Sequence, residues 1–307
     1  MTETPSPEVT REEYSVIDAR VRLPSEIRPR SSRAVLPALL RQQYDQILNM
    51  TEKVDAGTLP SLFTALDGAG ISHAVVHAEY EGADDAPALN DATVKLVAAH
   101  PSRLSGFGTI SMPPPTGGSA GREVQTCADL GLIGVNIQPA FFGLNIHDRR
   151  LYSGYARAEE LGLIVAVHTG INYSRLHPMA HERPEFLDQV ACDFPDLRLI
   201  ACHGGWPWVT EYCAIARRHP TVFLELGGLS PKYVARSGTG WDVLFGYMNN
   251  VLRDQVIFAT DWPIFPHDRA LHEWHDSGLR PGALAALLGG NARRLLGGPG
   301  LRDRTVP

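Results

Sequence analysis

Short β-branched runs alternate with longer amphipathic stretches along most of this chain of 307 residues. Several runs are nearly continuous apolar segments, as expected of parallel strands that are buried on both faces. The predicted strands are Ser15–Ala19, His73–His77, Leu104–Ile110, Gly134–Gln138, Leu163–His168, Arg198–His203, Val222–Leu226 and Val256–Thr260. Amphipathic segments between the strands predict helices, and strand–helix alternation repeated about eight times is typical of a (β/α)₈ barrel.

The spacing of the predicted strands is regular except at its start. Val75, Phe107, Asn136 and Ala166 lie in successive predicted strands, at successive steps of 32, 29 and 30 residues. Ile17 and Val75, in the first two predicted strands, lie 58 residues apart. We therefore expect a distorted TIM (β/α)₈ barrel with an inserted helical segment, about 30–57, after the first strand. This segment would suit a lid or an interface. A doubly wound open sheet is weakened by the strand count and by the lack of a GxGxxG sequence after the first strand.

Composition and charge limit the class of protein. Lys and Arg number 28 against 34 Asp and Glu, a net charge of −6, so there is no basic excess for binding nucleic acid. No apolar run approaches the ~18 residues of a membrane span, and residues 1–14 lack the apolar core of a secretory signal. The four cysteines have no CxxC spacing. We expect a reduced, cytoplasmic protein with a flexible arm over 1–14, a single domain over 15–307, and neither nucleic-acid nor membrane partners.

Polar side chains gather at the predicted carboxyl ends of the strands, where barrel enzymes place their active sites. His168, His203 and Asp261 are residue types suited to acid–base work, so we predict that they are catalytic. The first strand ends in Arg20 and Arg22, whose spacing puts both side chains on one face of a strand. Further candidates for contact with a substrate are His77, Asn172, Tyr173 and Glu225.

Four short motifs carry a resemblance to a known family. They read Val-His-Thr-Gly over 167–170, His-Gly-Gly-Trp-Pro-Trp over 203–208, Ala-Thr-Asp-Trp-Pro over 259–263, and Gly-Gly-Asn-Ala-Arg-Arg-Leu-Leu over 289–296. In this order the chain resembles the amidohydrolase superfamily, in the branch of enzymes like aminocarboxymuconate-semialdehyde decarboxylase. The resemblance implies a distorted (β/α)₈ barrel, decarboxylation, hydration or lactone chemistry, and a homo-oligomer, either a dimer or a tetramer.

One departure from the family pattern concerns metal binding. Members usually end the first strand with Asp-x-His-x-His, whose histidines bind a divalent metal, whereas this chain has Asp18, Arg20 and Arg22 there. Arginine offers no lone pair and stays cationic, so it cannot act as a metal ligand. Of the metal set that the resemblance implies, only His168 and Asp261 remain. We therefore expect no metal and no other cofactor.

Two roles are open for the arginines. Arg20 and Arg22 can bind a substrate carboxylate through forked, charge-assisted hydrogen bonds. Alternatively, they form salt bridges with Asp18, Asp261 or Glu225 and fill a site that no longer works. We favour the first role, because two histidines at the same rim remain available for contact with a ligand.

The first of three functional hypotheses is a metal-independent amidohydrolase-superfamily enzyme. It would use hydrolase, lactonase or cyclase-type chemistry on a small carboxylated, cyclic or aromatic substrate. Here His203 is the general acid or base, His168 polarises a carbonyl or transfers a proton, and Asp261 activates water or orients a histidine. The second is a decarboxylase or amidohydrolase that depends on a divalent metal. The third is a degenerate, non-catalytic barrel that binds a metabolite.

Overall fold

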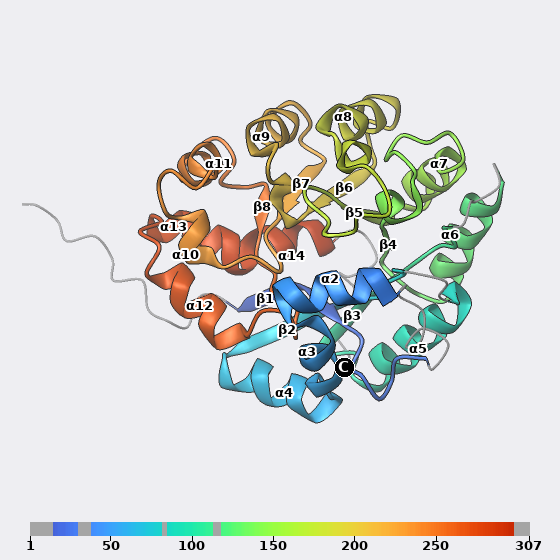
Figure 1. The fold of residues 1–307 in the computed structure, drawn as a ribbon, viewed down its shortest axis with the longest axis horizontal. Helices are drawn as coiled ribbons and strands as arrows, with labels where there is room; N and C mark the ends of the chain where they lie inside the picture. Colours follow the sequence, from blue (N-terminus) through green and yellow to red (C-terminus); the bar gives the residue numbers. More distant parts are fainter. Residues whose placement is uncertain (1–14, 30–37, 82–84, 113–117, 298–307) are drawn as a thin grey trace, which may run out of the picture.

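The computed structural model describes residues 15–29, 38–81, 85–112 and 118–297. Its eight parallel strands lie in sequence order in one sheet, which curves into a nearly closed barrel with helices around it (Figure 1). The strands are β1 (Val16–Arg22), β2 (Ile71–His77), β3 (Leu104–Gly108), β4 (Gly134–Ile137), β5 (Ile164–His168), β6 (Arg198–Cys202), β7 (Val222–Glu225) and β8 (Val256–Ile257). The predicted TIM barrel is confirmed, while the arm over 1–14 lies outside the described residues.

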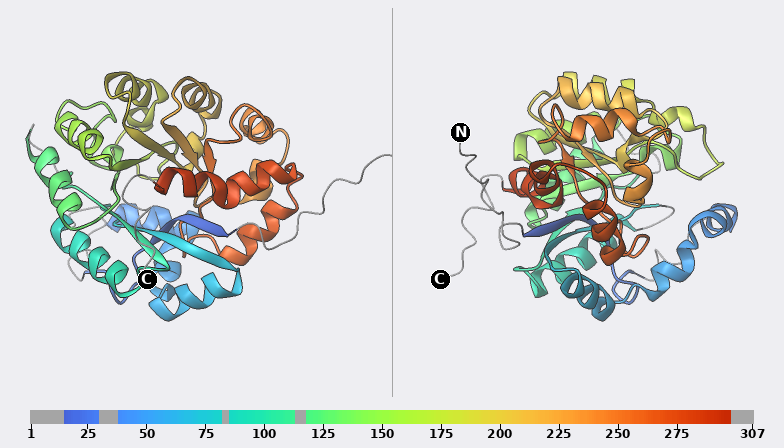
Figure 2. Two further views of the ribbon diagram at one scale, coloured as in Figure 1. Left: turned by 180° about the vertical axis from the view of Figure 1, so that it is seen from behind. Right: turned by 90° about the vertical axis from the view of Figure 1, so that its left-hand side faces the viewer.

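The helices lie mostly on the outside of the barrel, as Figure 2 shows from two further directions. They are α2 (Ala38–Leu48), α3 (Met50–Ala56), α4 (Leu59–Gly68), α5 (Ala86–Ala99), α6 (Ser119–Asp129), α7 (Tyr152–Leu161), α8 (Pro184–Asp193), α9 (Val209–Arg218), α10 (Pro231–Val234), α11 (Asp242–Met248), α12 (His267–His275), α13 (Pro281–Ala285) and α14 (Asn291–Leu296). Short turns of helix include η2 (Pro139–Phe142), η3 (Met179–Glu182), η4 (His203–Gly205) and η5 (Ala286–Gly290).

The barrel closes where β1 meets the chain after β8. The backbone N–H of Ala19 donates to the carbonyl of Phe258 at 3.0 Å, and that of Asp261 donates to Arg20 at 3.0 Å. The buried Asp18 carboxylate strengthens this seam, because it accepts from the backbone N–H and the hydroxyl of Thr260 at 3.1 and 2.5 Å. The seam places the end of β1 directly beside the residues that follow β8.

Two apolar layers hold the barrel together. Inside it, buried side chains such as Val75, Phe107, Ile200 and Ile257 fill the interior. A larger layer lies between the strands and the surrounding helices. Burial on both faces explains why the strand sequences are nearly continuous apolar runs.

Helix boundaries follow the capping residues only in part. Thr58 caps α4 as its sequence suggests, since its hydroxyl accepts from the N–H of Ser61 at 3.3 Å. Asn90 is also a residue type that favours a cap, but α5 begins four residues earlier, behind Asp85. Asn90 instead lies inside the helix, where its amide exchanges two hydrogen bonds with the backbone of Thr109. A tertiary contact thus uses a side chain whose type suggested a cap.

The chain between β1 and β2 carries α2, α3 and α4. In Figure 1, α2 crosses in front of the barrel, and in the side view of Figure 2 it stands out from the barrel on the side away from α14. Of the predicted insertion over 30–57, residues 30–37 lie outside the described residues. Its status as an insertion, and its role as a lid or an interface, stay predictions.

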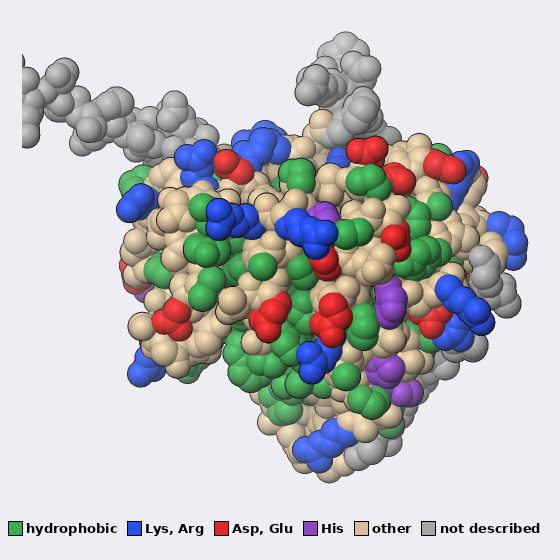
Figure 3. Space-filling view, turned by 90° about the horizontal axis from the view of Figure 1, so that it is seen from above, with side chains coloured by type: hydrophobic (Ala, Val, Ile, Leu, Met, Phe, Trp, Pro, Cys, Tyr) green, Lys and Arg blue, Asp and Glu red, His purple; other side chains and the backbone are tan. Residues whose placement is uncertain are grey.

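Two observations concern the expected lack of nucleic-acid and membrane partners: the charges on the surface and the length of the helices. On the face in Figure 3, acidic and basic side chains are interspersed with hydrophobic ones rather than gathered into a patch of one sign. Among the described residues, no helix is both long enough and apolar enough to cross a bilayer.

Candidate active site

A cavity of about 220 Å³ opens at the carboxyl ends of the strands. Its polar lining comprises Arg22, Glu81, Gln138, His168, His203 and Asp261. Its remaining walls are largely aromatic and aliphatic: Tyr44, Leu48, Met50, Phe141, Ile171, Tyr173, Trp206, Leu229, Trp241 and Ile264 among others. A few convergent polar groups beneath apolar walls are typical of a site for a small, partly apolar ligand.

Residues of α2 and α3 complete this cavity. Tyr44, Leu48 and Met50 form part of its lining, and the Tyr44 ring meets the Tyr173 ring edge to face at 5.9 Å between centroids. The Tyr44 ring also stacks on Phe141 at 6.3 Å. The segment between β1 and β2 therefore supplies one wall of the candidate site.

The two predicted catalytic histidines lie side by side. His168 ends β5, His203 follows β6, and their ring centroids are 4.8 Å apart. Nδ1 of His168 faces the carboxylate of Glu182 in a short hydrogen bond, and Glu182 also accepts from the amide of Asn172 at 2.6 Å. Because Glu182 is fully buried, it holds the His168 ring in one orientation. It also leaves Nε2 of His168 as the nitrogen available to a ligand.

His203 is held by its backbone neighbours. Its Nδ1 lies 2.8 Å from the carbonyl of Gly227, so this nitrogen carries the proton and Nε2 carries the lone pair. Burial, with the neighbouring His168 and Arg20, holds the pKa of His203 well below its usual value. His203 and Asp261 both adopt left-handed backbone conformations, with φ of 63° and 55°. Such strain in residues other than glycine clusters at functional sites.

Arg22 and Asp261 form a forked ion pair at the floor of the cavity. Nε and Nη2 of Arg22 donate to the two carboxylate oxygens of Asp261 at 3.1 and 3.2 Å, and Nη1 donates to Glu81 at 2.7 Å. A guanidinium has five N–H donors. The three hydrogen bonds of Arg22 therefore leave two N–H groups for a ligand. Burial raises the pKa of Asp261 to about 6, although Arg22 opposes that shift.

Arg20 lies beneath the cavity and does not line it. It is 1% exposed, and it donates to Glu79 at 2.5 Å, to Glu225 at 3.2 Å and to Asn136 at 3.0 Å. The geometry corrects the expectation that both arginines face a substrate. Arg20 follows the alternative, a salt-bridged side chain that fills the space, because carboxylates from β2 and β7 surround it.

Three other predicted contact residues also lie outside the cavity lining. His77 points its Nε2 at the carbonyl of Ala19 at 2.9 Å, and Glu225 pairs with Arg20. Asn172 braces Glu182. These three support their neighbours rather than touch a ligand in the cavity. Tyr173 lines the cavity, and its contact with a substrate stays a prediction.

The sequence analysis missed four buried polar residues of the site. Glu79 and Glu81 follow β2, Gln138 follows β4, and Glu182 ends the turn η3. The signal for the first three was present, since each lies just past a predicted strand end. Glu182 gave no such signal, because it lies 14 residues beyond His168 in sequence and only the loop between them brings the two together.

The metal that the resemblance implies does not fit these residues. Both oxygens of Asp261 already accept from Arg22, so of the ligand set that the resemblance implies only Nε2 of His168 stays available.

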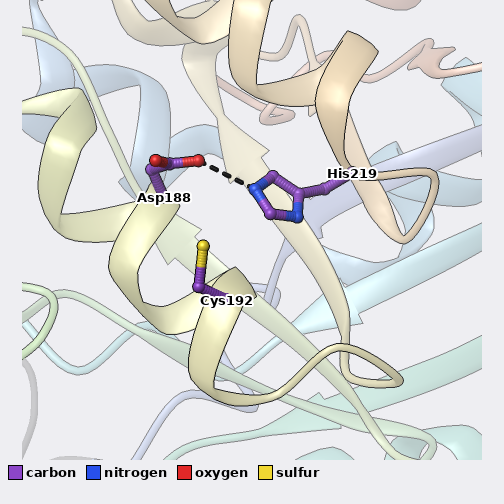
Figure 4. A group of neighbouring side chains, drawn as sticks. All are labelled: Asp188, Cys192 and His219. Atoms are coloured by element: carbon purple, nitrogen blue, oxygen red, sulfur yellow. Dashed lines mark hydrogen bonds and ion pairs between the residues drawn. The ribbon is translucent and has the colours of Figure 1, made fainter.

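One group of potential metal ligands lies elsewhere, on the outer helices (Figure 4). Asp188, Cys192 and His219 place one donor atom each within 4.8 Å of the others. Asp188 accepts from His219 at 2.8 Å and from Arg218 at 2.7 Å, and Arg218 also contacts the Cys192 sulfur at 3.5 Å. The Arg218 guanidinium thus already contacts two of the three potential metal ligands. We therefore interpret the group as a surface ion-pair network.

The sequence over residues 17–298 matches the family described as Amidohydrolase. The chain belongs to the amidohydrolase family. An uncharacterised TIM-barrel protein from Bordetella bronchiseptica is similar to it, at 26% identity and a TM-score of 0.77, over 92% of this chain and 98% of that one. This membership agrees with the expectation of an enzyme of the hydrolase or carboxy-lyase type.

Two further similar structures, at lower identity, are 5-carboxyvanillate decarboxylases. A 5-carboxyvanillate decarboxylase from Sphingomonas paucimobilis is 19% identical, with a TM-score of 0.66, over 92% of this chain and 98% of that one. Another, from Novosphingobium aromaticivorans, was solved with manganese and 4-hydroxy-3-methoxy-5-nitrobenzoic acid. It is 16% identical, with a TM-score of 0.67, over 94% and 97% of the two chains. At these identities the likeness extends to the fold.

Proposed function

We propose that this amidohydrolase is a carboxy-lyase that removes CO₂ from a small aromatic acid. The observation that carries the proposal is the cavity floor, where Arg22 offers two N–H groups beside two imidazoles and beneath aromatic walls. The similarity to 5-carboxyvanillate decarboxylases supports decarboxylation over hydrolase, lactonase or cyclase chemistry. Decarboxylation belongs to the second hypothesis above, which couples it to a divalent metal.

In the proposed reaction, Arg22 binds the substrate anion and holds the ring between the apolar walls. His168, protonated on Nε2, donates that proton to the ring carbon that bears the carboxylate, and the Glu182 carboxylate stabilises the charge on the imidazolium. The bond between this carbon and the carboxylate then breaks. Its electrons restore the aromatic ring, CO₂ leaves, and His168 regains a proton from water. Nε2 of His203 carries the lone pair and accepts a hydrogen bond from a ring hydroxyl, whose proton stays on the hydroxyl.

We further propose that the reaction needs no divalent ion. The support is the pairing of Asp261 with Arg22 and of Arg20 with Glu79 and Glu225. The comparisons themselves do not support metal independence, since one similar structure contains manganese. A manganese-dependent decarboxylase is therefore the second candidate function.

Activity and metal content test both proposals on the full-length protein. The substrates are the isomeric hydroxybenzoates and dihydroxybenzoates, and CO₂ release is measured before and after dialysis against EDTA. We expect release that survives dialysis, falls by about 10²-fold or more in His168→Asn, and is lost in Arg22→Met. Release restored only by manganese would replace metal independence with the second candidate. No release with any acid, with or without manganese, would contradict the carboxy-lyase proposal.

A further inference from the structure

Gln138 is a buried polar residue that the mechanism above does not use. It is the first residue after β4, is 3% exposed, and lines the cavity together with Arg22 and His203. Its position in the sequence places it at the carboxyl end of a barrel strand, where side chains meet substrates.

The orientation of the Gln138 amide is determined by Glu79. Nε2 of Gln138 donates to Oε2 of Glu79 in a short hydrogen bond, and the same oxygen accepts from Asn136 at 3.2 Å. Although burial opposes ionisation, Arg20 and Arg22 lower the pKa of Glu79 to about 2. An ionised carboxylate only accepts hydrogen bonds, so the amide nitrogen must face Glu79 and the amide oxygen must face away.

That oxygen has no hydrogen-bond partner. Oε1 of Gln138 is buried, and no described residue donates to it. A buried acceptor without a donor is unfavourable, and most such groups in folded proteins are paired. Because Gln138 lines the cavity, a molecule in the cavity can supply the donor.

We infer that Gln138 determines specificity by accepting a hydrogen bond from a hydroxyl or amino group of the substrate. This inference rests on the proposed function, because it takes the ligand to be an aromatic acid. The site then selects acids that carry such a donor and rejects ethers of the same shape, which leave Oε1 unpaired.

Equilibrium binding to the full-length protein tests the inference without turnover. The probes are 2-, 3- and 4-hydroxybenzoate, the three aminobenzoates and the three methoxybenzoates, each titrated by calorimetry into wild type, Gln138→Met and Gln189→Met. The last is a control at an exposed glutamine on α8. We expect at least one hydroxybenzoate or aminobenzoate to bind wild type about five- to tenfold more tightly than the methoxybenzoate substituted at the same position. Gln138→Met should remove this preference, and Gln189→Met should keep it.

Each result decides the matter. Equal wild-type affinity for donor and methoxy acids overturns the inference and leaves the proposed function standing, and this comparison does not depend on how any variant folds. A preference that persists in a folded Gln138→Met protein also overturns it. Binding of none of the acids by wild type overturns the inference together with the proposed function. The aminobenzoates and hydroxybenzoates together show whether Oε1 of Gln138 accepts a hydrogen bond from an amino group or from a hydroxyl group.

Discussion

At the scale of single residues, two buried guanidinium groups of the site lie among four carboxylates. Burying a guanidinium or a carboxylate alone is costly, so each one here faces partners of opposite sign. Arg20 meets Glu79 and Glu225, and Arg22 meets Glu81 and Asp261. The histidines are kept in single orientations by acceptors, Glu182 for His168 and the Gly227 carbonyl for His203.

Glu182 should act as a positioning residue through His168. Glu182→Gln keeps the shape but removes the charge that stabilises a protonated His168, so we expect kcat to fall by about 10–10²-fold with a small change in KM. The control is Glu185→Gln, an exposed residue on α8 that should behave as wild type. Steady-state kinetics with an accepted aromatic acid measure both. An unchanged kcat and pH profile in Glu182→Gln would remove this role.

His77 should make stability depend on pH. Burial, together with Arg20, lowers the pKa of His77 to about 3, whereas an unfolded histidine keeps a pKa of about 6.5. Unfolding therefore takes up a proton below about pH 6.5, and acidification favours the unfolded chain. His77 alone should remove about 1.4 kcal/mol of stability between about pH 7.5 and about pH 5.5.

Urea unfolding of wild type and His77→Gln at the two pH values checks this. The stability lost on acidification should be smaller in the variant by about that 1.4 kcal/mol. Equal losses in the two proteins would mean that folded His77 titrates normally.

At the scale of elements, the turn after β6 shows why glycine is needed beside His203. His203 begins η4, and Gly204 and Gly205 follow with φ of 62° and 74°. A Cβ on Gly205 would lie 2.0 Å from the Tyr212 ring of α9. The close approach of this turn to α9 thus sets where the His203 ring lies.

Gly205→Ala should therefore damage both stability and the site. We expect a loss of about 2–4 kcal/mol, from the positive φ and the overlap with Tyr212, and a fall in activity as His203 moves. Gly246→Ala is the matched control. It lies in helix α11 with open space around it, so alanine there should stabilise by about 0.5–1 kcal/mol. Chemical unfolding measures both, and a Gly205→Ala protein as stable as wild type would contradict this account of the turn.

At the scale of the whole molecule, Arg20 links strands that are distant in sequence. From β1 it reaches Glu79 after β2, Asn136 in β4 and Glu225 at the end of β7. The network crosses the barrel interior directly beneath the cavity. Its charge thus contributes both to the stability of the barrel and to the electrostatics of the site.

Arg20→Met should destabilise the fold by about 3–5 kcal/mol, because it leaves buried carboxylates without their cation. Arg253→Met, at a side chain 53% exposed and paired with Asp254, should cost less than about 1 kcal/mol. Denaturant midpoints of the two variants provide the measurement. Comparable effects would show that the buried network contributes little.

Much of the architecture could be predicted from the sequence, because it depends on local patterns. Apolar runs at regular spacing indicated the eight strands, and residues past their ends indicated which rim carries His168, His203 and Asp261. Boundaries were less certain, as at Asn90, where a contact with Thr109 overrides the capping preference.

What the sequence by itself determined is the alternation that makes a barrel and the residue types at its rim. Only the tertiary structure decided which of those residues line the cavity. Arg20 and Arg22 are two positions apart on one strand, yet one is enclosed by carboxylates and the other lines the cavity. The reason is physical: the strength and availability of a charge depend on partners that arrive from other strands and loops, and one-dimensional spacing does not specify those partners.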